Sequence, residues 1–194
     1  MKKLLLGCVM LFIIGILPVR VPARIVSRVH FEVSYDYSLG LSHSVGGHAL
    51  PQGYMERSGN MFHFTGIYDL NRAFSVGVGI GIDRYKSNIE TLPVFGTLRY
   101  RPFQKPTFKN LYTYTNIGYG IPYDDDRSLS SGLLLNIGLG WQKMFRSHFG
   151  INAHIGYCLN QFKDHAGYSW EGFTFDQKIS IWRNSTSFGF GFVF

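Results

Sequence analysis

Apolar and polar residues alternate along most of the chain after residue 28. The clearest run extends from Val29 to Leu41, where every second residue is apolar and those between are polar or Gly. A period of two predicts a β-strand with one apolar face. This run has 13 residues, whereas a strand of a soluble protein usually has about 5–6. It is long enough to cross a bilayer at a tilt, which takes about 9–11 residues.

The alternation recurs seven times, so the sequence predicts about eight strands. The predicted strands cover residues 29–41, 62–70, 74–82, 92–101, 111–121, 133–142, 149–159 and about 182–194. An even number of strands is what a closed single-chain barrel requires. We therefore predict an all-β fold, a closed antiparallel transmembrane β-barrel of about eight strands connected as an up-and-down meander.

The period alone does not say which face of the sheet points outward. Two features favour the apolar face outside. The opposite face is small and rich in Gly, which fits the narrow interior of a barrel of this size. The charges of Glu32, Asp36, Arg99 and Arg101 share that small face, where they could pair in a lumen. The alternative is a soluble ligand-binding barrel of lipocalin type with the faces exchanged, which gives no reason for a terminal Phe.

The predicted connections alternate in length. Four of them are longer or more polar, namely residues 42–58, 83–91, 122–131 and 161–181, and three are shorter, namely 70–73, 102–110 and 143–148. Long outer loops and short periplasmic turns are typical of outer-membrane barrels. This asymmetry predicts that both termini face the periplasm.

Aromatic residues recur near the predicted strand ends. One set falls near the periplasmic rim: Phe74, Tyr100, Trp141, Phe149 and Phe194. A second set falls near the outer rim: Tyr37, Phe62, Tyr119, Tyr157 and Trp182. Amphipathic rings at both interfaces form the girdles expected of a membrane barrel.

The first 23 residues have the features of a secretory leader. Lys2 and Lys3 precede an apolar stretch from Leu4 to Val19, and Val21-Pro22-Ala23 offers small residues for cleavage. We predict a signal peptide over 1–23 and an outer-membrane β-barrel domain over 24–194. The alternative is an uncleaved N-terminal anchor. Cys8 lies too near the start for a lipidation motif, because almost no apolar stretch precedes it.

Removing this leader lowers the charge of the chain. Three of the 19 basic residues go with it, which leaves 16 against 12 acidic ones and an excess of +4 instead of +7. Nucleic acid is therefore not expected as a partner. Cys158 is the one cysteine left, so an intramolecular disulfide is not possible.

Two segments resemble a known family. Leu92–Tyr100, with the sequence LPVFGTLRY, is similar to the fourth strand of the small outer-membrane β-barrels of Gram-negative bacteria, the OmpA/OmpX-like barrels. Asn184–Phe194, with the sequence NSTSFGFGFVF, is similar to their closing strand. The resemblance covers about residues 29–194. It implies that the run Phe188, Phe190, Phe192, Phe194 is a membrane-insertion signal read by the barrel assembly machinery. It does not imply one activity, because the family includes adhesins and structural barrels.

Polar side chains on the small face are the main candidates for function. They are His30, Glu32, Asp36, His63, Arg99, Arg101 and His154. An unpaired charge inside a barrel is costly, so residues of mixed sign should form paired networks. We expect a plug of ion pairs that stiffens the barrel. A gated proton or ion path is the alternative.

A lipid-modifying hydrolase is a further alternative. It would need a Ser/His pair with an acid, and the candidates are His43 with Ser44 or Ser147 with His148. Neither pair lies in a recognisable nucleophile context, so we predict no catalytic residues and no enzyme activity. The run Asp124-Asp125-Asp126 lacks the spaced ligands of a calcium loop, so neither a metal nor another cofactor is expected.

The longest predicted loop carries aromatic residues at positions 162, 168, 170, 173 and 175. Exposed rings on a long loop suggest a binding surface, unless the strands extend above the membrane and the rings pack together. We therefore expect a monomer with a structural or surface-interaction role, with an extracellular ligand on loops 42–58 and 161–181. Outer-membrane lipid and lipopolysaccharide are the expected surroundings.

Overall fold

The structure is a computed structural model that describes residues 28–45, 48–49, 58–85, 89–103, 108–122, 130–146, 149–170 and 173–194. The leader, Asp124–Asp126 and the Ser147–His148 pair lie outside these ranges. The strands are β1 (Val29–Val45), β2 (His48–Ala49), β3 (Ser58–Asp69), β4 (Phe74–Tyr85), β5 (Ile89–Tyr100), β6 (Leu111–Pro122), β7 (Ser130–Arg146), β8 (Phe149–Trp170) and β9 (Phe173–Val193). Within the described ranges, no helix is long and apolar enough to cross a membrane.

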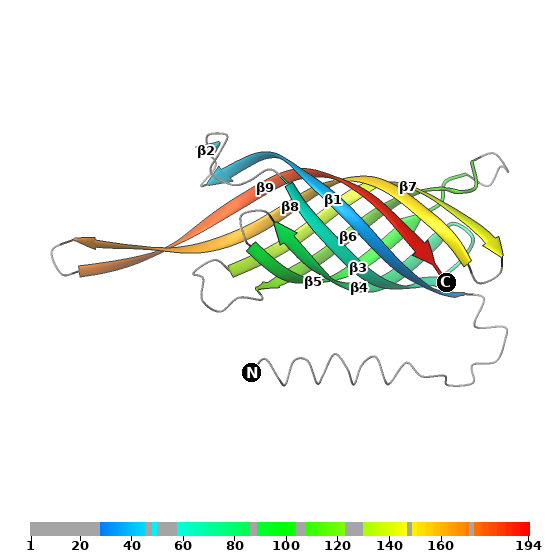
Figure 1. The fold of residues 1–194 in the computed structure, drawn as a ribbon, viewed down its shortest axis with the longest axis horizontal. Helices are drawn as coiled ribbons and strands as arrows, with labels where there is room; N and C mark the ends of the chain where they lie inside the picture. The colour runs from blue at the N-terminus through cyan, green and yellow to red at the C-terminus, as the bar shows by residue number, and fades with distance from the viewer. Residues whose placement is uncertain are drawn as a thin grey trace, which may run out of the picture.

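Eight long strands form one closed barrel (Figure 1). Each of β3 to β9 pairs antiparallel with its neighbour in the chain, and β9 pairs with β1 to close the sheet. The two residues of β2 pair only with the end of β1. Reciprocal backbone hydrogen bonds of 2.8 and 2.9 Å between Phe31 and Phe194 complete the seam at the C-terminus. The predicted closed antiparallel meander of about eight strands is confirmed.

The register fixes the tilt of the strands. A path that follows paired residues once around the barrel leaves β1 at His30 and returns to it at Gly40, ten residues along. The path runs through Ile67, Gly77, Thr97, Asn116, Asn136, Cys158 and Ser185. A stagger of ten residues over eight strands corresponds to a tilt of about 40°. The interior of such a barrel is just wide enough for side chains to fill.

Polarity is inverted relative to a soluble protein. Glu32, Asp36, Arg99 and Asn152 are buried inside the barrel, whereas Val78 on the outside is 70% exposed. The exposed outer face includes Tyr35, Leu39, Phe62, Phe64, Ile80, Ile82, Val94, Leu98, Ile117, Tyr119, Leu133, Ile137, Leu139, Ile155, Tyr157, Phe188, Phe190 and Phe192. The facing predicted from the small, Gly-rich pattern is therefore correct.

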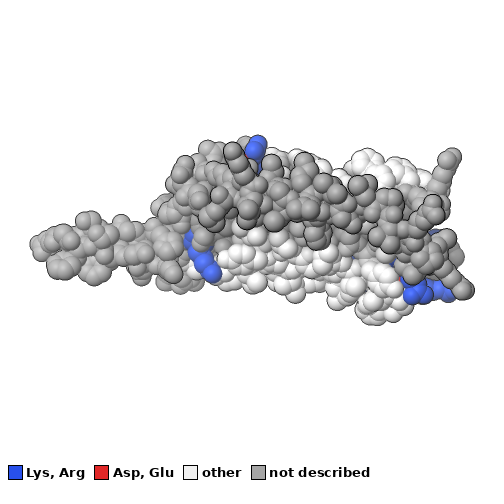
Figure 2. All heavy atoms as spheres, turned by 90° about the horizontal axis from the view of Figure 1, so that it is seen from below, with Lys and Arg blue, Asp and Glu red and all other residues white. Residues whose placement is uncertain are grey.

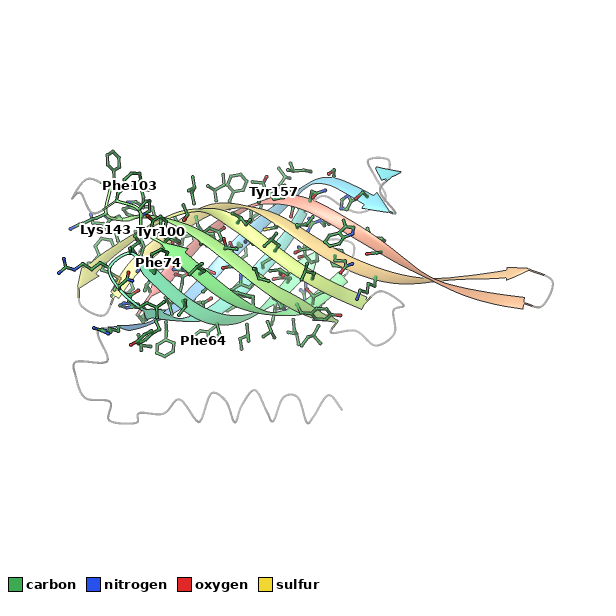
Figure 3. All side chains as sticks on the ribbon, turned by 180° about the vertical axis from the view of Figure 1, so that it is seen from behind. Phe64, Phe74, Tyr100, Phe103, Lys143 and Tyr157 are labelled. Atoms are coloured by element: carbon green, nitrogen blue, oxygen red, sulfur yellow. The ribbon has the colours of Figure 1, made fainter. Side chains whose placement is uncertain are left out.

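The ends of the barrel differ from its middle. On the face drawn in Figure 2, Lys and Arg lie toward the two ends of a white surface, and no Asp or Glu is visible on it. Figure 3 places Phe74 and Tyr100 at the end that holds the C-terminus, with Tyr157 farther toward the other end. The rings of Phe74 and Tyr100 stack with centroids 4.8 Å apart.

Glycines make room for the interior side chains. A Cβ at Gly140 would overlap the Tyr112 ring, and one at Gly189 would overlap the contact between His154 and Asp36. The large polar side chains of the lumen therefore lie directly over the backbone of neighbouring strands.

Two predicted loops are wrong. Residues 83–91 contain the end of β4 at Tyr85 and the start of β5 at Ile89, so three residues connect the strands. Residues 161–181 continue β8 to Trp170 and begin β9 at Phe173, and the pair extends beyond the other strands as a two-stranded ribbon (Figure 1). The polar residues of this segment were misleading, because backbone pairing between β8 and β9 continues through it. Part of the residues predicted as long loops at this end therefore belong to strands.

Candidate functional site in the barrel interior

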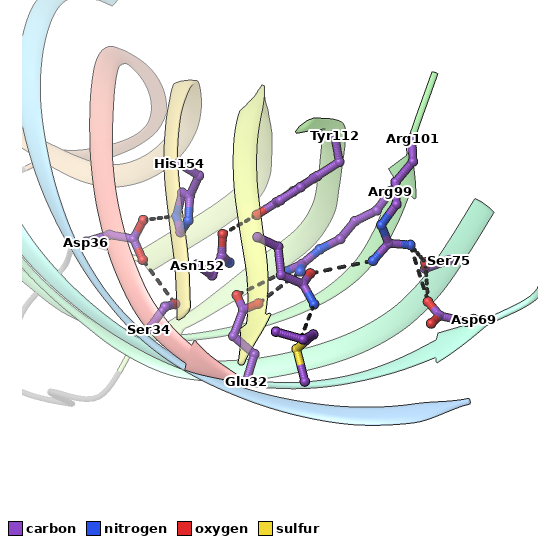
Figure 4. Close-up of polar contacts among 12 residues, drawn as sticks. Glu32, Ser34, Asp36, Asp69, Ser75, Arg99, Arg101, Tyr112, Asn152 and His154 are labelled. Atoms are coloured by element: carbon purple, nitrogen blue, oxygen red, sulfur yellow. Dashed lines mark hydrogen bonds and ion pairs between the residues drawn. The ribbon is translucent and has the colours of Figure 1, made fainter. Parts of the chain in front are cut away.

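All seven polar residues predicted for the lumen lie on the inward face and contact other interior side chains. They come from β1, β3, β5 and β8, except Arg101, which directly follows β5. Their contacts form successive layers along the barrel (Figure 4). Because the barrel is narrow, several of these contacts join strands that are not neighbours in the sheet, as Glu32–Arg99 and Asp36–His154 do.

The first layer lies at the end that holds the C-terminus and centres on Asp69. Its carboxylate contacts His30 Nε2 at 3.0 Å and accepts a hydrogen bond of 2.5 Å from Ser75. Arg101 donates to Ser75 at 2.7 Å and to Asp69 at 3.4 Å. Asp69 and Ser75 are cross-strand partners beside the β3–β4 turn. In that turn, Asn71 Oδ1 accepts hydrogen bonds of 2.8 Å from the N–H groups of Ala73 and Phe74.

The second layer is a buried ion pair across the lumen. The two amino groups of the Arg99 guanidinium donate to the two carboxylate oxygens of Glu32 at 2.9 and 3.0 Å. Glu32 is on β1 and Arg99 on β5, with β3 and β4 between them. The guanidinium lies 4.9 Å from the centroid of the Tyr112 ring, and the Tyr112 hydroxyl donates to Asn152 at 2.6 Å. This fork geometry is the strong form of a carboxylate–guanidinium contact.

The third layer alternates carboxylates and imidazoles. Asp36 contacts His154 Nε2 at 2.5 Å and His63 Nδ1 at 3.5 Å. The other ring nitrogen of His63, Nε2, lies 2.9 Å from Asp83. Because both nitrogens of His63 face carboxylates, the arrangement needs a hydrogen on each and therefore an imidazolium. Ser34 donates to Asp36 at 3.3 Å.

The fourth layer surrounds Tyr85 toward the other end. The Tyr85 hydroxyl donates to Asp83 at 3.4 Å and accepts a hydrogen bond of 2.8 Å from Asn160. The Arg183 guanidinium lies 4.4 Å from the centroid of the Tyr85 ring. Phe162 packs edge-on against the same ring at 5.6 Å.

The described lumen brings acidic and basic side chains together. Four carboxylates, those of Glu32, Asp36, Asp69 and Asp83, face three guanidinium groups and the imidazolium of His63. The guanidinium groups belong to Arg99, Arg101 and Arg183. Charges in a low-dielectric interior are stable only when paired in this way.

The space left in the lumen is small. A cavity of about 20 Å³ lies between the second and third layers and is lined by Glu32, Asp36, His63, Arg99 and His154 among others. That volume holds about one water molecule. Side chains therefore close the middle of the barrel. Among the described residues, no group of three or more His, Cys, Asp or Glu side chains could hold a metal ion.

Sequence reasoning missed several members of the network, notably Asp69, Asp83, Asn152 and Arg183. The period of two could have identified them, because each lies an even number of positions from the inward residues of its own strand. Tyr112 and Tyr114 share the parity of Asn116 but are aromatic. Their alternating position along the strand predicts that they face inward, whereas their residue type does not.

The proposed hydrolase pair on β1 does not form. A bulge between Gly40 and Ser42 shifts the facing of the strand, and His43 pairs across from Arg183, which points inward. Ser44 is the next residue, so its side chain points to the opposite face. The two cannot act together as a nucleophile and its base.

The interior and exterior define the class of the molecule: an inside-out β-barrel with a polar, charge-paired lumen and an apolar outer surface. No protein-family model matches the chain, and no curated protein matches it. Among solved structures, the chain is similar to the outer membrane protein AlkL in lipid bilayers, with 14% identity over 86% of this chain and 90% of that one, at a TM-score of 0.47.

Two further structures show a similar likeness. Neisserial surface protein A is 11% identical over 83% of this chain and 95% of that one, with a TM-score of 0.41. Ail of Yersinia pestis is 14% identical over 84% of this chain and 99% of that one, with a TM-score of 0.37. At these scores the likenesses add nothing to what the barrel's own geometry shows.

Proposed function

We propose that this chain is an integral outer-membrane β-barrel protein with a sealed lumen and a structural or surface-interaction role. The observation that carries the proposal is the inverted polarity. A buried ion pair, Glu32–Arg99, crosses the interior, and apolar side chains such as Val78 are exposed around the outside. In water this arrangement would be unfavourable on both faces.

The dimensions of the barrel support this proposal. Strands β3 to β6 have 12 residues each. At a rise of about 3.3 Å per residue and a tilt of about 40°, they span about 30 Å along the barrel axis. The hydrocarbon core of a bilayer is about 30 Å thick.

Polar groups on the outer face also behave as a lipid environment requires. Tyr35 donates to Asn60 at 2.7 Å, and Tyr157 donates to Asn184 at 2.6 Å. Asn184 in turn donates to Ser42 at 3.0 Å. Without water, an unpaired polar group costs several kcal/mol, so pairing between exposed side chains is expected in a membrane.

The leader and the closing strand support an outer-membrane location. Phe188, Phe190 and Phe192 point outward on β9 and Phe194 directly follows it, with 43–51% of each residue exposed. This leaves the run accessible to an assembly factor before the barrel closes. The proposal has both ends of the barrel chain in the periplasm and the β8–β9 ribbon outside the cell.

Planar-bilayer conductance tests the sealed lumen. Wild-type protein should give no large, steady current, because the four layers of side chains fill the interior. Arg99→Ala removes the group that crosses the lumen and should raise the current. Folding of both proteins is checked by the mobility difference between heated and unheated gel samples. Porin-like steady conductance from the folded wild type would contradict a sealed lumen.

A further inference from the structure

The rim of the barrel that holds the C-terminus carries an unpaired set of basic residues. Arg28, Arg72, Lys109 and Lys143 are all exposed there, and we call them the basic rim. No ion pair joins any of them to a carboxylate among the described residues. The one acidic residue described at this rim, Asp69, turns inward to His30, Ser75 and Arg101.

The basic rim is continuous around part of the circumference. The Asp69 N–H donates to the Arg28 carbonyl at 2.8 Å, which places Arg28 beside the turn that carries Arg72. Farther around the same rim, between β6 and β7, the Gln142 N–H donates to the Asn110 carbonyl at 2.9 Å. That bond brings together the segments that carry Lys109 and Lys143.

Aromatic rings lie among these charges and mark the depth of the membrane surface. Lys143 Nζ lies 5.6 Å from the centroid of the Phe145 ring, and Phe103 and Phe108 pack at 5.7 Å. Figure 3 shows Lys143 and Phe103 at the same end of the barrel as Phe74 and Tyr100. Because rings of this kind settle at the headgroup level, the basic rim lies within reach of lipid phosphates.

The opposite end differs in charge. There the exposed Arg84 is held by Glu90, with Nε 2.7 Å from the carboxylate oxygen. A basic residue that already has a carboxylate partner offers little to a second anion. The basic rim is thus the described surface that best complements negative charge.

We propose that the basic rim binds the headgroup phosphates of anionic phospholipids in the membrane leaflet that surrounds it. This inference rests on the proposed membrane-spanning function. Lys and Arg side chains near an anionic lipid surface each contribute about fivefold in affinity. The rim therefore selects phosphatidylglycerol-type lipids over zwitterionic ones.

Tryptophan quenching by brominated lipids tests the proposal. Trp141 lies on β7 two residues from Lys143, and Trp170→Phe with Trp182→Phe leaves it as the one tryptophan of the three. This full-length protein is refolded into phosphatidylcholine vesicles that contain either brominated phosphatidylglycerol or brominated phosphatidylcholine. We expect quenching to report a preference for phosphatidylglycerol of about fivefold or more. Salt at about 1 M should weaken that preference.

Two variants make the test specific. Arg72→Gln with Lys109→Gln and Lys143→Gln should remove the preference, whereas Arg84→Gln at the other end should keep it. Equal quenching by the two lipids, or equal loss in the Arg84→Gln control, would overturn the lipid proposal and leave the membrane barrel standing. Absence of quenching by either lipid would overturn both.

Discussion

Single residues decide whether the lumen can hold its network, and the glycines show this best. Gly189 on β9 lies where a Cβ would overlap both His154 Nε2 and Asp36 Oδ1. Gly66 on β3 faces outward, and its nearest neighbour to such a Cβ is a ring carbon of Phe31 at 3.7 Å, an ordinary contact. The same residue type thus has a packing role at one position and none at the other.

We predict that Gly189→Ala destabilises the barrel by about 1–3 kcal/mol, because the contact between His154 and Asp36 has to move. Gly66→Ala is the matched control and should change stability by less than about 0.5 kcal/mol. Urea unfolding of the proteins refolded in lipid vesicles gives both values. Equal stability of the two variants would show that the central layer tolerates displacement.

The identity of the lumen residues could be predicted from sequence, whereas their partners could not. Parity within a strand assigns Glu32 and Arg99 to the same face of the sheet. Their contact depends on the ten-residue stagger around the barrel. That stagger is a property of all eight strands together and cannot be predicted from the sequence of any one of them. The pairing of His63 with Asp83 depends in the same way on the register of β3 against β4.

At the scale of elements, the sequence predicts the presence of each strand more accurately than the residues at which it begins and ends. The alternation that predicts a strand reflects two different faces, an exposed apolar one and a buried polar one. Polar residues follow that alternation on β8, yet β8 and β9 continue to pair as far as Trp170 and Phe173. The β1 bulge after Gly40 likewise has no clear mark in the sequence, although it decides that His43 faces inward.

The β8–β9 ribbon provides a test of orientation. Beyond Lys163 on β8 and Ile181 on β9, the two strands pair only with each other among the residues that the structure describes. An epitope inserted between residues 171 and 172 should therefore leave the barrel folded. We predict that antibody labels this epitope on intact cells. A second epitope near the C-terminus is not used as a control, because an insertion after Phe190 would disrupt the closing strand. Antibody against a periplasmic protein of the same cells shows instead whether the outer membrane is intact. Labelling only after the outer membrane is opened would contradict the proposed orientation.

At the scale of the whole molecule, the barrel combines a filled, polar interior with an apolar exterior. The charge-paired layers connect strands on opposite sides of the lumen, as Glu32 of β1 and Arg99 of β5 do. The β8–β9 ribbon projects from the end of the barrel away from the C-terminus, where a surface role would reside.

The free energy of unfolding of Val78→Arg tests the central claim, that this outer face meets lipid. Val78 is 70% exposed near the middle of β4. In a bilayer, Arg at this depth should cost about 2–4 kcal/mol, whereas Leu70→Arg in the turn at the rim should cost about 0–1 kcal/mol. Urea titration of both variants in lipid vesicles measures the difference. We predict a large loss at position 78 and little at position 70. A Val78→Arg protein as stable as the wild type would mean that this face lies in water.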